Sequence, residues 1–218
     1  GIKDFNPSIN GSGIDKLEKA HINVFQNILE KECYEINKGF FKWIEHGKPW
    51  VIVKIAQSNN GFMGIDSKSS IWITGDDVKV HTHKLRSRVD GILVGRKTIE
   101  VDNPKLTVRK VEGNNPIRIV ADTYRKLPLN LELFKDKSAE NIVLCSMDKF
   151  KRSKTENSTY LPIKEENALL SPDDILNKLG TYGLNTLLIE GGKKIISSFL
   201  NKNLVDEVYL YTSKNNLE

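Results

Sequence analysis

The chain has 218 residues, 39% of them hydrophobic, and its formal net charge is +5. This length predicts one compact domain or a domain with a small appendage, and the modest charge fits an enzyme whose ligands carry phosphates. A nucleic-acid partner is disfavoured, because the lysines are spread along the chain and no basic cluster is interleaved with aromatic residues.

The cysteines and the hydropathy indicate the compartment. Cys33 lies in a helical pattern and Cys145 ends an apolar run, so both are expected as packed core thiols rather than nucleophiles. No secretory segment is present, and no apolar run approaches the roughly 20 residues that cross a bilayer. We therefore expect a cytoplasmic protein with no membrane partner.

The first quarter predicts a short helix and a long one. Residues 15–21 have the short helical pattern, and residues 22–25 are strand-like. Across residues 28–45 the apolar positions recur at near-helical spacing, and Gly47 with Pro49 ends this helix.

A β-branched run at residues 50–56 predicts a central strand that contains one lysine, Lys54. Burying a lysine in such a run is costly without a partner. Lys54 therefore either pairs with a carboxylate or faces a ligand at the exposed end of the strand. Thr74 is the expected N-cap of a following helix that runs to about Arg88.

Residues 91–109 combine a buried strand, a glycine, a short helix at 97–101 and a polar loop that Pro104 opens. The end of a strand is where ligands bind in open α/β sheets. Three polar side chains of different chemistry would meet there: Thr98, Asp102 and Arg109. An ordinary connection with a solvated loop is the alternative, and taken alone the stretch fits both equally.

The second half alternates strands and helices. Strands are expected at residues 117–120, 141–145, 186–189 and 205–211, a turn at 122–125, a surface loop at 149–159, and helices after Ser171 and around Ile195 to Leu200. Ser171 is the expected N-cap of the first of these helices, with Pro172 at its first position. The alternation predicts an α/β fold with a mostly parallel central sheet and helices on both faces.

Glu190-Gly191-Gly192 forms a second candidate site directly after a buried strand. A strand, two glycines and a helix place unpaired backbone N–H groups where a phosphate can approach closely. A plain strand-to-helix turn is the competing interpretation. The glutamate at the strand end favours the functional one.

Other ligand fingerprints are absent from the sequence. Neither the Rossmann glycine pattern nor the P-loop pattern is present. No cysteine or histidine spacing suits a metal, and the nucleobase deaminase signature is missing. His81 and His83 lie two residues apart and cannot share a helix face, so we expect surface or packing residues rather than ligands.

Five motifs, in order, resemble the reductase domain of the bifunctional bacterial riboflavin-biosynthesis deaminase/reductase. They are residues 49–58, 70–74, 83–86, 102–109 and 189–192. Earlier residues, at 6–13 and 22–24, resemble the tail of the deaminase domain that precedes this reductase. The resemblance implies that residues 1–48 are that tail plus a linking helix, and that residues 49–218 are the reductase domain.

The resemblance implies a dihydrofolate-reductase-like fold. It also implies NADPH-dependent reduction of the ribosyl group of 5-amino-6-(5-phosphoribosylamino)uracil to the ribityl group. The cofactor-binding residues are then expected to be Ala56, Trp72, Thr98, Asp102, Thr123, Gly192, Lys193, Lys194, Ile195, Ile196, Ser197 and Ser198. The substrate-binding residues are expected to be Ser70, Arg86, Leu106, Arg109 and Glu190. The two arginines would hold the phosphate, which a guanidinium fork suits better than an ammonium does.

In this reaction a hydride passes from the nicotinamide to the anomeric carbon of a ring-opened, imine-like sugar. The protein positions the two partners and handles a proton as the ring oxygen becomes a hydroxyl. Lys54, Asp102 and Glu190 are the available catalytic acid/base groups. Our hypothesis is that Glu190 anchors the substrate and that Lys54 or Asp102 assists proton movement.

The chain departs from the family pattern in several places. Asn60 and Asn103 stand where the family has aspartates, and further C-terminal strands and the deaminase body are expected to be missing, so the chain should not deaminate. Two alternatives remain open: a related NADPH reductase of a pterin or another pyrimidine, and a non-catalytic nucleotide-binding module. The resemblance also implies a homodimer or higher homo-oligomer, for which the exposed edge of the final strand is a natural pairing site.

Overall fold

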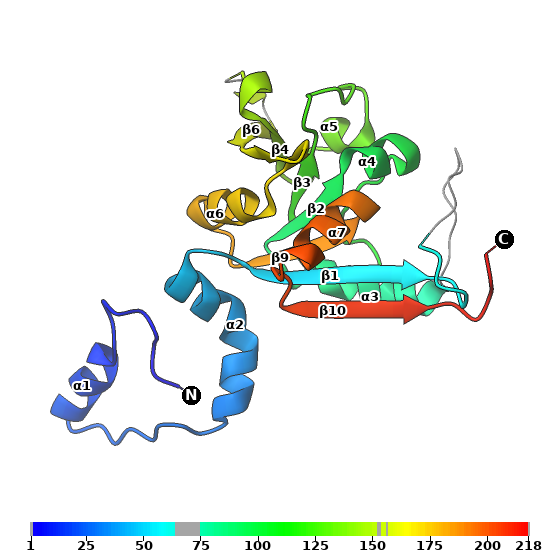
Figure 1. Cartoon of the computed structure of the whole chain (residues 1–218). Coiled ribbons are helices and arrows are strands. Elements are labelled where there is room, and N and C mark those ends of the chain that lie inside the picture. The colour runs from blue at the N-terminus through cyan, green and yellow to red at the C-terminus, as the bar shows by residue number, and fades with distance from the viewer. Residues whose placement is uncertain (1, 64–74, 152–153, 156, 218) are drawn as a thin grey trace.

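The computed structural model describes residues 2–63, 75–151, 154–155 and 157–217. Its centre is an eight-stranded sheet with the order β10-β1-β9-β2-β3-β4-β6-β5 (Figure 1), in which only β5 and β6 pair antiparallel among the described residues. The strands are β1 (Trp50–Gln57), β2 (Gly91–Gly95), β3 (Ile117–Ala121), β4 (Asn141–Ser146), β5 (Lys154–Thr155), β6 (Ser158–Ile163), β9 (Thr186–Gly191) and β10 (Glu207–Thr212). A separate short ladder joins β7 (Glu165–Glu166) to β8 (Leu169–Leu170).

The direction in which the chain crosses the sheet decides which face each helix covers. From β1 the chain proceeds through β2 and β3 to β4, and after β6 it returns to β9 and β10. Right-handed crossovers put the helices of these two directions on opposite faces. The first group is α3 (Asp76–Arg86), α4 (Arg96–Asp102) and α5 (Glu132–Lys135); the second is α6 (Pro172–Tyr182) and α7 (Lys193–Asn201). The predicted mostly parallel sheet with helices on both faces is confirmed.

Alternation along the strands builds a separate core on each face. Val51 and Val53 belong to the cluster that includes residues of α6 and α7, whereas Ile52 belongs to the cluster that includes Leu85 of α3. Side chains two residues apart in a strand share a face. Lys54 therefore lies on the α3 face of the sheet.

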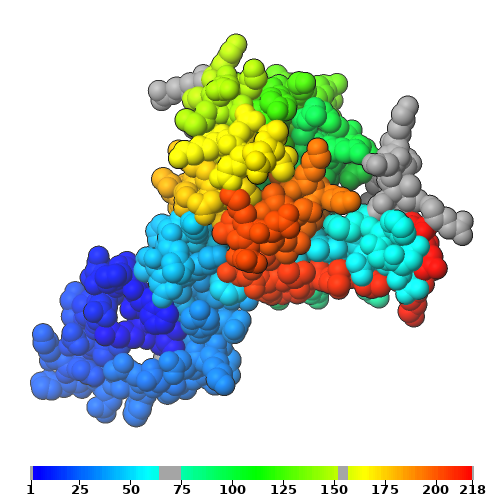
Figure 2. All heavy atoms as spheres, viewed as in Figure 1, coloured from blue at the N-terminus to red at the C-terminus, as the bar shows by residue number. Residues whose placement is uncertain are grey.

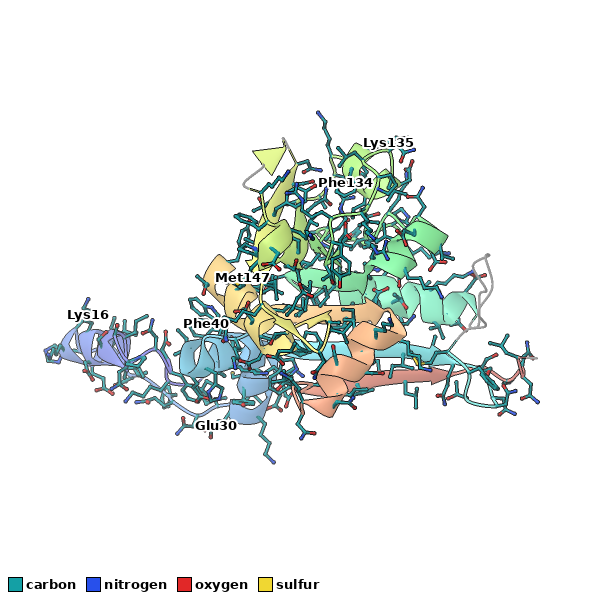
Figure 3. The ribbon with its side chains drawn as sticks, turned by 45° about the horizontal axis from the view of Figure 1, so that its top comes forward. Lys16, Glu30, Phe40, Phe134, Lys135 and Met147 are labelled. Atoms are coloured by element: carbon teal, nitrogen blue, oxygen red, sulfur yellow. The ribbon has the colours of Figure 1, made fainter. Side chains whose placement is uncertain are left out.

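The N-terminal part, with α1 (Ser12–Lys19) and α2 (Glu30–His46), lies at the end of the sheet where β1 and β10 begin (Figure 1). Lys38 and Lys42 of α2 form ion pairs with Glu207 and Asp206, at 2.7 and 2.5 Å. The region of α1 extends away from the body in the space-filling view (Figure 2). Figure 3 shows the same separation, with Lys16 and Glu30 far from Phe134 and Lys135 of α5.

The predicted helices and strands are confirmed to within about three residues, except in two places. Residues 22–25 form no strand, because no neighbouring strand pairs with them. The predicted surface loop at 149–159 is also wrong in part, since it contains the start of β6, which pairs with β4. Thr74, the expected N-cap, lies outside the described residues; Ser171 does cap α6 by accepting a bond from the Asp174 N–H. No helix in the described part of the chain is long and apolar enough to cross a membrane.

Candidate active site

The connections that follow the neighbouring strands β2 and β9 diverge. After β2 the chain leads through α4 to β3, and after β9 it leads through α7 to β10, in the opposite direction across the sheet. Ligands of open α/β folds bind at the carboxyl ends of strands at such a switch point. Three residues expected in the site lie at or just beyond this edge: Thr98 in α4, Thr123 after β3, and Ala56 near the end of β1.

Glycines allow the turns that follow β2 and β9 to pack closely together. A Cβ on Gly192, whose φ is +93°, would lie 3.4 Å from the backbone of Gly95, and a Cβ on Gly191 would lie 3.3 Å from the Thr98 hydroxyl oxygen. The N-cap of α7 is Gly192, which has no side chain with which to cap the helix. Backbone N–H groups at such a turn bind phosphate, so the turn fits the diphosphate of a dinucleotide. Ile196, expected along the cofactor, has its side chain in the core.

Arg86 and Glu190 form a two-bonded ion pair beside these turns. The Arg86 Nε and Nη2 groups each donate to one Glu190 carboxylate oxygen at 2.7 Å, and Nη1 donates to the Thr107 carbonyl at 3.2 Å. The side chains are only 11% and 8% exposed. The family resemblance implies that both residues hold the substrate, and in the structure Arg86 and Glu190 bind each other.

A bulge in β9 presents Glu190. The β2–β9 ladder is regular to Leu93 and Ile189 and resumes at Val94 and Gly191, so Glu190 is an extra residue in its strand. Bulges re-aim side chains and are common beside active sites. From this bulge the Glu190 side chain extends to α3 and binds Arg86.

Lys54 lies on the same face as this pair. Burial lowers its pKa; the positive charge of Arg86 also lowers it, and the negative charge of Glu190 opposes the shift. Within the described ranges Lys54 has no carboxylate within 4 Å, so it forms no direct ion pair there. A buried amine with a lowered pKa gives up its proton more readily than an exposed lysine does.

Two tyrosines of β10, which were not predicted as site residues, also lie on this face. Tyr209 lies beside Lys54 in the β1–β10 ladder and Tyr211 lies beside Ala56. The ring of His81 contacts both tyrosines, and its Nδ1 is hydrogen-bonded to the Tyr211 hydroxyl. Burial and the charge of Glu190 raise the pKa of Tyr211. The signal that could have revealed them is the alternation of side chains along the predicted final strand, which puts Tyr209 and Tyr211 on the same face.

The loop after α4 carries Arg109. Leu106 is buried with a φ of +55°, which only a tightly held loop imposes on such a residue. Arg109 is exposed, and its Nη1 donates to the Thr107 hydroxyl at 2.6 Å. Its backbone N–H donates to Nδ1 of His83 at 3.1 Å. His83 is buried, as its predicted packing role requires.

The remaining expected residues are more peripheral. Asp102 is exposed at the last position of α4. Thr123 accepts the N–H of Ser146 through its carbonyl, in a turn shaped by the buried carboxylate of Asp122, which sequence reasoning missed. Ser70 and Trp72 lie outside the described residues. No group of three metal-ligating side chains occurs in the part of the chain that is described.

Comparison with known proteins now identifies the family. The RibD C-terminal domain matches residues 49–213. The chain belongs to this family. It is 30% identical to riboflavin biosynthesis protein RibD of Actinobacillus pleuropneumoniae, over 97% of the chain and 57% of that protein. It is also 30% identical to 2,5-diamino-6-ribosylamino-4(3H)-pyrimidinone 5′-phosphate reductase of Aquifex aeolicus, over 75% of each.

Solved RibD structures share the fold. Acinetobacter baumannii RibD superposes with a TM-score of 0.84 at 26% identity, covering 98% of this chain and 59% of that one. The deaminase/5-amino-6-(5-phosphoribosylamino)uracil reductase of Thermotoga maritima superposes with a TM-score of 0.83 at 27% identity, covering 99% and 59%. The expected dihydrofolate-reductase-like fold is confirmed. The chain spans about three fifths of the length of the RibD proteins it matches.

Proposed function

We propose that the chain reduces the ribosyl group of 5-amino-6-(5-phosphoribosylamino)uracil to the ribityl group in riboflavin biosynthesis, with NADPH as the reductant. The observation that carries the proposal is the buried Arg86–Glu190 pair, placed beside a double-glycine turn at the switch point of the sheet. The names of the Aquifex and Thermotoga relatives support the same substrate class.

The cofactor is proposed to lie along the carboxyl ends of β1, β9, β2 and β3. Gly192 and the first turn of α7, residues 193–195, would hold the diphosphate through free backbone N–H groups, with the Thr98 hydroxyl and residues 196–198 beside them. Ala56 and Thr123, at opposite ends of this row of strands, would contact the two ends of the dinucleotide. Trp72 and Asp102 complete the proposed set. When bound, NADPH supplies the hydride.

The substrate is proposed to lie on the α3 face. Arg109 is exposed and carries a guanidinium that suits a phosphate, and Arg86 adds positive charge nearby while it orients Glu190. Glu190 would anchor the substrate, with Leu106 and Ser70 beside it.

We assign the proton step to Lys54 in preference to Asp102. The ring oxygen of the sugar takes up a proton as it becomes a hydroxyl. The lowered pKa of buried Lys54 suits donation, and Lys54 lies on the face that carries Glu190. Asp102 is exposed at the end of α4 and is proposed only as a cofactor contact.

Three wider statements belong to the same proposal. Residues 1–48 are the tail of a deaminase domain with a linking helix, and residues 49–218 are the reductase domain. The protein acts in the cytoplasm. It forms a homo-oligomer through β10, whose outer edge pairs with no described strand and whose Val208 and Leu210 are exposed.

Asn60, a departure from the family, has a local structural role. Its amide Nδ2 donates to the Leu217 carbonyl at 2.8 Å and its Oδ1 accepts the Ser58 hydroxyl at 2.6 Å. An aspartate would lack the donor. Asn60 therefore ties the turn after β1 to the C-terminal segment.

The test is to mix the purified chain with NADPH and the deaminated phosphoribosylaminopyrimidine and to follow the loss of reduced-nicotinamide absorbance. Turnover should be abolished by Arg109→Ala and by Glu190→Gln. The matched control is Arg88→Ala, which removes an exposed arginine just beyond the C-terminal end of α3. Bound but unconsumed NADPH would favour a non-catalytic module, consumption with a pterin alone would favour the related reductase, and no NADPH binding would refute both reductases.

A further inference from the structure

His83 is buried where α3 meets the loop that carries Arg109. The side chain is 6% exposed, and its Nδ1 lies 3.1 Å from the backbone nitrogen of Arg109. Because that backbone group is a donor, Nδ1 must be an unprotonated acceptor. The ring is then neutral, with its proton on Nε2.

Helix α3 holds this loop at two points. Arg86 donates to the Thr107 carbonyl, and His83 accepts the Arg109 N–H two residues further on. The Arg109 guanidinium in turn donates to the Thr107 hydroxyl. The segment from Thr107 to Arg109 is thus fixed to the helix that also presents Arg86 to Glu190.

We propose that His83 is a positioning residue which, as a neutral imidazole, fixes the Arg109 backbone and so aims its guanidinium at the substrate phosphate. The inference rests on the proposed function, since it assigns to Arg109 the phosphate of that substrate. In this role His83 acts through Arg109 and does not itself contact the substrate.

The surroundings keep His83 neutral near physiological pH. Its pKa is lowered chiefly by burial, and also by the positive charges of Arg86, Arg109 and Lys110, while Glu190 on β9 opposes them. Protonation would place an N–H on Nδ1 opposite the Arg109 N–H. Two donors repel, so the contact breaks and phosphate binding weakens as the pH falls through the pKa of His83.

Two substitutions separate this role from simple packing. His83→Asn can place an amide oxygen near the position of Nδ1 and does not titrate; His83→Leu fills the space without an acceptor. His83→Leu should raise KM for the phosphorylated substrate on the order of tenfold, the effect of one lost buried hydrogen bond, and leave kcat nearly unchanged. His83→Asn should keep the wild-type KM at neutral pH.

The pH dependence of KM is the decisive measurement. The substrate phosphate titrates near pH 6 itself. His83→Asn should retain that contribution and lose the additional rise of KM in acid that the wild type shows. A wild-type KM in His83→Leu, or an unchanged acid rise in His83→Asn, would overturn the proposal.

A second readout does not depend on turnover. Nitrogen NMR of the wild type should show unprotonated Nδ1 at neutral pH and an Arg109 amide shift that titrates with His83. Ribose 5-phosphate, used as the probe, should bind more weakly to His83→Leu than to His83→Asn. If these results hold and no substrate is reduced, the proposed function fails and the role of His83 stands. A protonated Nδ1 at neutral pH refutes that role alone.

Discussion

Where β1 and β9 begin, backbone atoms of neighbouring segments are in direct contact, whereas near the ends of these strands charged groups are buried side by side. At the first end a Cβ on Gly180 would lie 1.8 Å from the Gly47 carbonyl oxygen, and the Trp43 indole donates to the Gly180 carbonyl. At the other end the Arg86–Glu190 pair is desolvated near Lys54.

The difference separates stability from function. Backbone groups at the beginning of β9 have a partner on the neighbouring segment: the Asp90 carboxylate accepts the N–H groups of Asn185 and Thr186 at 2.8 and 2.9 Å. A buried ion pair adds little stability compared with apolar side chains of the same size, and a buried lysine reduces stability. Such groups persist where they act on a ligand. We expect substitutions at the two ends to affect different measurements.

The largest expected effect is that of Glu190→Gln. Arg86 then stays buried without a counter-charge, and the free energy of unfolding should fall by about 3 kcal/mol. Turnover should fall at least ~100-fold, because the substrate loses its anchor. Urea unfolding and kcat/KM measure the two quantities.

The double variant Arg86→Met with Glu190→Met is the control for that experiment. Apolar side chains of similar length should restore most of the stability and none of the turnover. Recovery of both would show that the pair is only structural. Unchanged substrate affinity and turnover in Glu190→Gln would refute the assignment of Glu190.

Gly180→Ala tests the opposite end of the sheet. The added methyl group cannot fit against the Gly47 carbonyl, so we expect a loss of about 3 kcal/mol and a fall in Tm of roughly 6–12 °C. KM and kcat of the folded protein should not change. Gly13→Ala in α1, where a Cβ meets nothing within 4 Å, is the control and should cost no stability. A changed KM with an unchanged Tm in Gly180→Ala would contradict the expectation that this end of the sheet affects stability and not catalysis.

Lys54→Met should raise stability and lower turnover. Since the folded pKa of Lys54 is lowered, the charged form costs stability at neutral pH. The unfolded chain binds more protons between the folded pKa and the ordinary value, so the wild type gains stability as pH rises through that window. The gain in the free energy of unfolding that Lys54→Met has over the wild type should therefore be largest below the folded pKa of Lys54 and should decrease above it. Thermal unfolding across pH measures this, with Lys84→Met, at an exposed position of α3, as the control.

Local signals account for what the sequence predicted well. The N-cap Ser171 and the apolar strand runs are set by residues close in the chain, and the structure confirms them. The polar run at 149–159 concealed the start of β6, whose partly exposed side chains leave a weak apolar pattern. At residues 22–25 the pattern of a strand was present and a pairing partner was not.

The candidate site was predictable as a set of residues and not as a set of contacts. Arg86 and Glu190 lie 104 positions apart, so nothing in either motif showed that they bind each other. The same holds for His81 with Tyr211, which meet only when β10 joins the sheet beside β1. The bulge at Glu190 depends on the register with β2, which no single strand specifies.

The smallest expected effect is that of Asn103→Asp, which restores a family residue near the active end of the sheet. Asn103 has a φ of +38°, and its Oδ1 accepts the Glu132 N–H at 2.9 Å. Aspartate accepts the same bond and tolerates this conformation, so stability should stay within about 0.5 kcal/mol. Asn103→Ala should cost about 1–2 kcal/mol, because it loses both features. A several-fold rise in turnover for Asn103→Asp at unchanged Tm would show that a carboxylate at this position acts in catalysis. Loop geometry alone would then not explain the position, because only a carboxylate near bound ligands could produce such a rise.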